Sequence, residues 1–136
     1  MRRVFVDTSG FFAFLCAEDR SHGHARELFA EADAQRWRLM TTNAVVTETH
    51  ALLVARLRDG RRYGIEFLER IERTELRVER IRPVDEKRAI ALLRRHADKD
   101  YSLCDALSFV VMERLKVNEA IAFDRHFREY GRLVTL

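Results

Sequence analysis

The chain has 136 residues, about the length of one domain, and combines 47% hydrophobic with 35% charged residues. With one proline and five glycines, this composition excludes the disordered, collagen-like and low-complexity classes. The net charge of +3 neither requires nor excludes a polyanionic partner such as a nucleic acid.

The N-terminal segment imitates a secretory signal, because Arg2 and Arg3 precede an apolar run. Asp7 interrupts that run and no clean cleavage site follows, so we expect no export. The sequence contains no run of about 18 consecutive apolar residues, so we expect no membrane span. Cys16 and Cys104 lie too far apart in the sequence for a disulfide framework or a metal knuckle, and we expect both to be small buried apolar groups in a reducing cytoplasm.

The first half of the chain predicts two strands that alternate with helices. An apolar run at residues 4–6 predicts a strand, and apolar residues at helical spacing predict a helix over 22–34. A second strand is expected at 38–42. Asn43 is the expected N-cap of the helix that follows, and Gly60 is expected to end or interrupt that helix.

The second half of the chain continues the alternation. Apolar residues at helical spacing over 64–71 predict a helix, and Pro83 separates a weaker strand at 76–81 from a helix with Ala89 and Ile90 on its apolar side. The remaining predicted elements are a helix at 103–115, a strand at 120–123, a short helix at 125–130 and a last strand at 133–136. Because such alternation builds parallel sheets between helices, we expect one three-layer α/β/α domain with a central, mostly parallel sheet of about four to five strands.

Four acidic residues fall where ligands of such sheets bind, or face inward beside that place. Asp7 and Asp124 each follow a predicted buried strand, and the carboxyl ends of parallel strands surround a shared ligand site. Glu48 lies three residues after Val45, on the inward face of its helix. Asp105 begins the buried surface of a mostly apolar helix.

Each acid also has a purely structural interpretation. Asp7 can turn the chain after its strand, and Asp124 can cap the short helix that follows it. Ser102 and Asp105 match a capping box, which is the favoured interpretation of Asp105 taken alone. Glu48 can pair with an arginine. What favours a site is the set of four acids on separate elements.

A cluster of carboxylates needs a positive charge nearby. Two carboxylates 4 Å apart repel by about 4 kcal/mol at an effective dielectric near 20, so a converging group must hold protons, recruit arginines or bind a cation. Oxygen ligands favour Mg²⁺ or Mn²⁺ over zinc. Such an ion lowers the pKa of a bound water and neutralises the charge of a phosphodiester transition state, so the sequence favours metal-assisted hydrolysis.

The four acids lie within short motifs spread along the chain. The motifs are VFVDTS at 4–9, TNAVVTE at 42–48, SLCDA at 102–106 and AFDRHF at 122–127. In this order and with these spacings they resemble the PIN-domain ribonucleases, specifically the VapC-like toxins of bacterial and archaeal toxin–antitoxin pairs. The resemblance spans nearly the whole chain and implies a single PIN domain over residues 1–136.

The resemblance carries expectations about activity and partners. It implies a toxin that is a metal-dependent endoribonuclease, which hydrolyses RNA with Mg²⁺ or Mn²⁺, forms a homodimer and is inhibited by a cognate VapB-like antitoxin. The implied metal ligands and catalytic residues are Asp7, Glu48, Asp105 and Asp124. Thr8 and Ser9 are expected to orient these acids through their hydroxyls. Many relatives carry Thr two residues before the fourth acid, where this chain has Ala122, and we expect a tuned site rather than an inactive one.

Three further features keep two interpretations each. Asp100 can extend the acidic site, but it also fits an ordinary solvated loop and is not among the predicted ligands. His126 can touch the substrate, or it can pack the short helix onto the sheet. A basic patch can guide an RNA backbone or form a solvated turn. Its residues are Arg56, Arg58, Arg61 and Arg62.

Two other functions compete with a nuclease. A phosphoryl-transfer protein also places an acid after its first strand, but the segment Asp7, Thr8, Ser9 lacks the second aspartate that such phosphatases use two residues on. A non-catalytic PIN-like module that binds RNA or protein remains the alternative. Loss of one or more acids would indicate such a module, and this chain retains all four.

Overall fold

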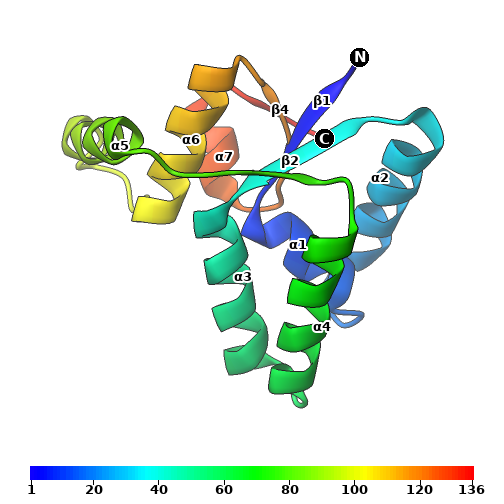
Figure 1. Ribbon diagram of the computed structural model, residues 1–136. Coiled ribbons are helices and arrows are strands. Elements are labelled where there is room, and N and C mark those ends of the chain that lie inside the picture. The colour runs from blue at the N-terminus through cyan, green and yellow to red at the C-terminus, as the bar shows by residue number, and fades with distance from the viewer.

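A five-stranded parallel sheet forms the centre of the computed structural model, which describes residues 1–136 (Figure 1). The strands lie in the order β3-β2-β1-β4-β5. Their bounds are β1 Arg3–Val6, β2 Arg38–Thr42, β3 Arg77–Glu79, β4 Glu119–Ile121 and β5 Val134–Thr135. All neighbouring strands are parallel, and Phe5 of β1 aligns with Met40 of β2 on one side and with Ala120 of β4 on the other. The predicted parallel sheet is therefore confirmed.

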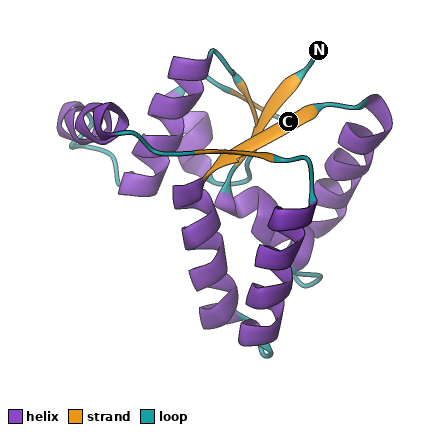
Figure 2. Cartoon of the chain, viewed as in Figure 1, coloured by secondary structure: helices purple, strands orange, loops and turns teal.

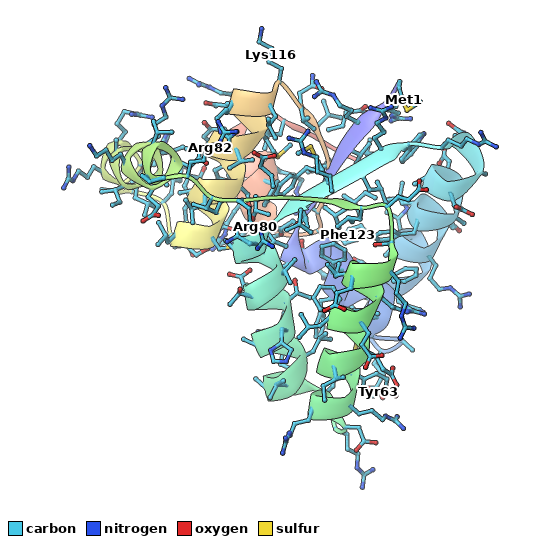
Figure 3. All side chains as sticks on the ribbon, viewed as in Figure 1. Met1, Tyr63, Arg80, Arg82, Lys116 and Phe123 are labelled. Atoms are coloured by element: carbon cyan, nitrogen blue, oxygen red, sulfur yellow. The ribbon has the colours of Figure 1, made fainter.

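Helices lie on both sides of this sheet and complete the α/β/α arrangement (Figure 2). Their bounds are α1 Thr8–Leu15, α2 His22–Gln35, α3 Asn43–Arg56, α4 Gly60–Arg73, α5 Pro83–Arg95, α6 Leu103–Leu115 and α7 Arg125–Tyr130. Helices α3 and α4 pack side by side and project away from the sheet, with Tyr63 near the tip (Figure 3). None of the helices combines the length and apolarity needed to span a lipid bilayer.

The strand order reverses between β1 and β4. From β1 the chain builds β2 and β3 on one side, and it later returns to place β4 and β5 on the other. Ligands of open parallel sheets bind outside the carboxyl ends of the strands at such a point. The backbone N–H of Asp7 donates to the carbonyl of Ile121 at 3.2 Å, so the residues that follow these two strands are brought together.

Helix α6 is the central helix of the hydrophobic core. Eight consecutive residues from Asp105 to Met112 are buried, which explains why apolar residues encircle this helix. Phe109 packs edge-to-face on Phe127 of α7, with ring centroids 4.9 Å apart, and Phe127 stacks on Phe5 of β1. These three rings join the elements that carry or adjoin Asp7, Asp105 and Asp124.

Helix α1 is not among the elements predicted from the sequence. Its eight residues are apolar on nearly every side, so they lack the spacing that identifies an amphipathic helix. Asp7 caps the helix, and Gly10 lets it pack closely because a Cβ there would collide with the backbone oxygen of Ile121. Tertiary packing against the end of β4 therefore selects this helix.

The start and end of α3 differ from the prediction. The N-cap is Thr42, whose Oγ1 accepts a hydrogen bond from a backbone N–H in the first turn at 3.1 Å. Asn43 is the first helical residue, and its Oδ1 accepts a hydrogen bond from the backbone N–H of Ile81 at 2.8 Å. The helix ends at Arg56, and Gly60 begins α4. The prediction of Asn43 as the cap was wrong because its side chain binds the segment after β3 instead.

Helix α5 turns a different side toward the protein from the predicted one. Ala89 is buried as expected, but Ile90 is 46% exposed, and Asp85 and Leu92 are buried instead. Arg114 of α6 donates two hydrogen bonds to Asp85, each of 2.9 Å. This buried ion pair fixes the rotation of α5, and periodicity alone could not reveal it.

Strand β4 ends at Ile121, before the predicted end at residue 123. The backbone N–H of Phe123 donates to the hydroxyl of Ser9 at 2.9 Å rather than to a neighbouring strand. Asp124 therefore follows a short loop and not the strand itself. This loop brings Asp124 over the start of α1.

Candidate active site

The four acids predicted from the sequence lie at the carboxyl edge of the sheet or near the starts of helices beside it. Asp7 follows β1 directly, and Glu48 lies in the second turn of α3. Asp105 is in the first turn of α6, and Asp124 directly precedes α7. Asp7 and Asp105 are buried, whereas Glu48 and Asp124 are half-buried.

Asp7 is an almost completely buried carboxylate, with 3% of the residue exposed. It caps α1, because its Oδ2 accepts hydrogen bonds from Ser9 N at 3.3 Å and from Ser9 Oγ at 2.9 Å. Burial raises the pKa of Asp7 to about 7; the bond from Ser9 opposes this rise and the charge of Asp105 adds to it. The ionised form is therefore disfavoured unless a positive charge is supplied.

The hydroxyl of Ser9 joins the two loops that carry Asp7 and Asp124. It donates to Asp7 Oδ2, and it accepts from the backbone N–H groups of Phe123 at 2.9 Å and Asp124 at 3.3 Å. The neighbouring hydroxyl of Thr8 is buried and makes no hydrogen bond. Of the two hydroxyls predicted to orient the acids, only that of Ser9 contacts them.

Asp105 forms the predicted capping box with Ser102. The backbone N–H of Asp105 donates to Ser102 Oγ, and the backbone N–H of Ser102 donates to Asp105 Oδ2, both at 3.0 Å. The structural interpretation of Asp105 is thus correct as far as it goes. The capping bond from Ser102 engages only Oδ2 of the Asp105 carboxylate.

Asp124 caps α7 and lies beside a histidine. Its Oδ1 accepts a hydrogen bond from the backbone N–H of His126 at 2.9 Å. The side chain of His126 returns toward the acids, with Nδ1 2.8 Å from Asp105 Oδ2 and 3.3 Å from Asp124 Oδ1. One ligand atom from each of Asp105, Asp124 and His126 therefore lies within 4.8 Å of the other two.

In Asp7, Asp105 and Asp124, the protein donors all converge on a single oxygen. Asp7 and Asp105 accept at Oδ2, and Asp124 accepts at Oδ1. The second oxygen of each carboxylate receives no hydrogen bond from the protein. Carboxylate oxygens are the ligands that Mg²⁺ and Mn²⁺ prefer, so these free oxygens fit a hard divalent cation.

Glu48 forms no ion pair, so the alternative that it pairs with an arginine is not realised. Burial raises the pKa of the Cys104 thiol well above its ordinary value, and the charges of Glu48, Asp7 and Asp105 raise it further. All three acids thus act on the same thiol. Cys104 therefore stays protonated. Both Cys104 and Cys16 are half-buried, so the prediction that they are buried was wrong.

The four acids do not all meet in one ligand-sized group. Asp105 and Asp124 belong to the group within 4.8 Å, whereas Asp7 and Glu48 lie outside it. The charge of Asp105 nevertheless raises the pKa of Asp7, so these two share one electrostatic environment. No arginine or lysine forms an ion pair with any of the four. Their joint role as metal ligands stays a prediction.

Two residues of the site were not among the predicted ligands. His126 contacts Asp105 through Nδ1, and its Nε2 lies 2.9 Å from Asp100 Oδ1. Burial lowers the pKa of His126, but the charges of Asp105 and Asp124 and the hydrogen bonds to Asp100 and Asp105 raise it overall. The sequence signal was the position of His126 two residues after Asp124, but which way the ring turns depends on α6.

A comparison with protein families finds that the PIN domain model matches residues 4–133. The chain belongs to the PIN-domain family. This confirms the resemblance inferred from the four motifs. The PIN domain of this chain is also 37% identical, over 128 residues, to the 23S rRNA-specific endonuclease VapC20 of two Mycobacterium tuberculosis strains, CDC 1551 and H37Rv, with 94% of each chain covered.

Three solved structures share this fold. The crystal structure of Mycobacterium tuberculosis VapC20, described as a sarcin–ricin loop cleaving toxin, matches with a TM-score of 0.85 and 37% identity over 94% of this chain and 95% of that one. VapBC2 from Rickettsia felis, bound to promoter DNA, matches with a TM-score of 0.67 at 12% identity over 98% and 97% of the two chains. FitAcB from Neisseria gonorrhoeae gives 0.66 at 13% over 98% and 96%. The last two show the fold alone.

Proposed function

We propose that this PIN-domain protein is the endoribonuclease toxin of a VapBC-like toxin–antitoxin pair and hydrolyses RNA phosphodiester bonds with Mg²⁺ or Mn²⁺. The observation that carries the proposal is a set of carboxylates at the carboxyl edge of the sheet without arginine or lysine partners. The metal ligands and catalytic residues are Asp7, Glu48, Asp105 and Asp124. The likeness to VapC20 over 94% of both chains supports the same chemistry.

The chain's own residues prepare the site for a cation and a phosphate. A bound divalent ion would supply positive charge at the scissile phosphate and lower the pKa of the attacking water. Asp7 is held by Ser9 in a buried position where its ionised form needs such a charge. Asp105 and Asp124 are each anchored at one oxygen by a capping bond, which leaves the other oxygen to bind an ion.

Ribosomal RNA is the substrate class that we propose. VapC20 is named as a 23S rRNA-specific endonuclease, and its structure is described as that of a sarcin–ricin loop cleaving toxin. The tip formed by the end of α3 and the start of α4 offers exposed arginines for phosphate contacts. Arg62 pairs with Asp59 only at 3.7 Å, with both side chains largely exposed, so this pair leaves the arginine available.

A VapB-like antitoxin is the protein partner that we propose. A groove of about 1250 Å³ lies between α2, α4 and the strands β2 and β3, with Phe29, Phe67 and Ile71 among its lining residues. An apolar groove of this kind suits one face of an amphipathic segment. The likeness in fold to VapBC2 and FitAcB supports this partner. We further propose a homodimer that acts in the cytoplasm.

The proposal is tested with an RNA hairpin that contains a sarcin–ricin loop. We expect the purified protein to cut it in Mg²⁺ or Mn²⁺ and to stop in a chelator. Asp7→Asn is the informative variant, because asparagine caps a helix as well as aspartate and so preserves the start of α1. Loss of the charged ligand should reduce cleavage by about a thousandfold, equivalent to several kcal/mol of transition-state stabilisation.

Three results would contradict the proposal. They are cleavage that resists the chelator, full activity in Asp7→Asn, and no cleavage of any RNA by a protein that binds RNA tightly. The last would favour the non-catalytic PIN-like module. Circular dichroism of the variant is the control for folding.

A further inference from the structure

His126 lies among three carboxylates at the edge of the candidate site. Its Nδ1 is 2.8 Å from Asp105 Oδ2 and 3.3 Å from Asp124 Oδ1, and its Nε2 is 2.9 Å from Asp100 Oδ1. Because an ionised carboxylate oxygen only accepts hydrogen bonds, the ring donates its Nδ1–H to Asp105. The side chain is 14% exposed, so the ring is largely enclosed by the protein.

The ring is held from its outer side. Asp100 accepts from Nε2, and Arg125 in turn donates to Asp100 Oδ2 at 2.6 Å. Tyr101 packs edge-to-face against the imidazole, with ring centroids 5.5 Å apart. Asp100 and Tyr101 therefore fix the orientation of the His126 ring.

The bond from His126 changes what Asp105 can do. Asp105 Oδ2 accepts from the backbone N–H of Ser102 at 3.0 Å and from His126 Nδ1 at 2.8 Å. Two donors from different elements on one oxygen fix the plane of the carboxylate, which a single capping bond would leave free to rotate. The second oxygen, Oδ1, is then presented in one direction. The same Nδ1 lies 3.3 Å from Asp124 Oδ1, so the ring sits between the acid of α6 and the acid that precedes α7.

We infer that His126 is a positioning residue that, through its Nδ1–H, sets the carboxylates of Asp105 and Asp124 to receive one divalent cation. This inference rests on the proposed function, since it assigns a role within the same metal site. Asp100 acts behind His126 by holding Nε2. Neighbours that orient the ligands of a metal commonly contribute 10- to 100-fold to its affinity, so the expected effect is about that size.

Replacement of His126 by two amides separates positioning from packing and from charge. In His126→Asn the amide nitrogen takes the place of Nδ1 and can still donate to Asp105, without a positive charge. In His126→Gln the amide nitrogen takes the place of Nε2 and can reach only Asp100. His126→Ala removes both bonds. The matched control is His96→Asn, because His96 packs on the same Tyr101 ring but is not hydrogen-bonded to a carboxylate.

The main measurement is Mn²⁺ binding by calorimetry in the absence of RNA. We expect His126→Ala and His126→Gln to weaken binding by about 10- to 100-fold. His126→Asn should keep most of the affinity, and His96→Asn should bind as the wild type does. At saturating Mn²⁺, His126→Ala should reach most of the wild-type kcat for RNA cleavage, since the ring orients the ligands and does not touch the reacting atoms.

Four outcomes would overturn the inference. The first is that His126→Ala binds Mn²⁺ at least as tightly as the wild type. The second is that His126→Asn binds as weakly as His126→Ala. The third is that His126→Gln binds as tightly as His126→Asn. The fourth is a directly coordinated imidazole nitrogen in the pulsed EPR spectrum of the Mn²⁺-loaded wild type, because the ring would then be a ligand.

Wild-type behaviour distinguishes failure of this inference from failure of the proposed function. A wild-type protein that binds no Mn²⁺ and cuts no RNA would overturn both. A wild type that binds and cuts, with activity lost in Asp105→Asn but Mn²⁺ affinity unchanged in His126→Ala, would overturn only the positioning role. Thermal unfolding of the metal-free variants confirms that each is folded at the temperature of the titration.

Discussion

Asp85 of α5 and Glu79 of β3 are buried with Arg114 of α6 bound to both, whereas Asp7 and Asp105 are buried at the carboxyl edge of the sheet without an arginine or lysine partner. The two pairs have similar burial and the same kind of acid group. They differ in the charge that the protein provides. In the first pair an arginine compensates both acids, whereas in the second Asp105 has only His126 beside it and Asp7 has no cationic partner.

The pKa directions follow that difference. Burial alone would raise the pKa of Asp85, but the hydrogen bonds and charge of Arg114 hold it below its ordinary value, and the same is true of Glu79. Burial raises the pKa of Asp7 to about 7, and the bond from Ser9 only partly opposes it. The protein thus places an arginine beside Asp85 and Glu79, and it places neither an arginine nor a lysine beside Asp7 and Asp105, where a cation is proposed to bind.

Removal of Arg114 should have the largest effect on stability. Arg114→Met leaves Asp85 buried without a charged partner and leaves Glu79 with only Arg77 and Arg82, which should reduce the free energy of unfolding by about 3 to 5 kcal/mol. Urea denaturation measures this loss. The control is Arg73→Met, because Arg73 is 76% exposed in its pair with Glu69 and should contribute at most about 1 kcal/mol. Equal losses in the two variants would mean that the buried network has no special role.

The pH dependence of stability should have opposite signs in the two groups. An unfolded aspartate titrates near 3.8 and the folded Asp7 at about 7, so between these values only the folded chain keeps the proton. The stability gained from that proton is complete below the unfolded pKa, and it falls as pH rises toward 7 by up to about 4 kcal/mol. Asp85 behaves oppositely, because its lowered pKa gives stability that is lost as pH falls below its ordinary pKa.

Denaturation curves of the chelator-treated protein, measured from acid to neutral pH, test this difference. Asp7→Asn should abolish the decline toward neutral pH and leave the acid side unchanged. A decline of the same size in that variant would show that Asp7 is not its source. Saturating Mn²⁺ should restore stability at neutral pH in the wild type and not in the variant.

The hydroxyl of Ser9 should give the smallest of these effects. Ser9→Ala removes three hydrogen bonds that join Asp7 to the loop before α7, and we expect a loss of about 1 to 2 kcal/mol in the free energy of unfolding. Ser108→Ala is the matched control, since Ser108 Oγ is buried without a hydrogen-bond partner and its removal should be neutral. If both variants unfold at the same urea concentration as wild type, the hydroxyl does not join the loops.

The spacing of apolar residues predicted most of the helices and strands, because the buried side of a helix repeats every three to four residues and a buried strand is a short apolar run. Helix α6 is predicted with its observed bounds, since its buried surface reaches all around it. Helix α1 was missed and α5 was rotated relative to the prediction, because Gly10 packs on Ile121 and Arg114 pairs with Asp85 across long stretches of sequence. No local pattern contains such contacts.

By itself the sequence determined the alternation of strands and helices, the family motifs and the positions of four acids, because these features are local or follow from the direction of parallel strands. Only the tertiary structure decided which acids are compensated and how the ring of His126 lies. The reason is that both depend on the distance between side chains of different elements, Arg114 with Asp85 and His126 with Asp105. Electrostatic compensation is a property of that distance and of burial.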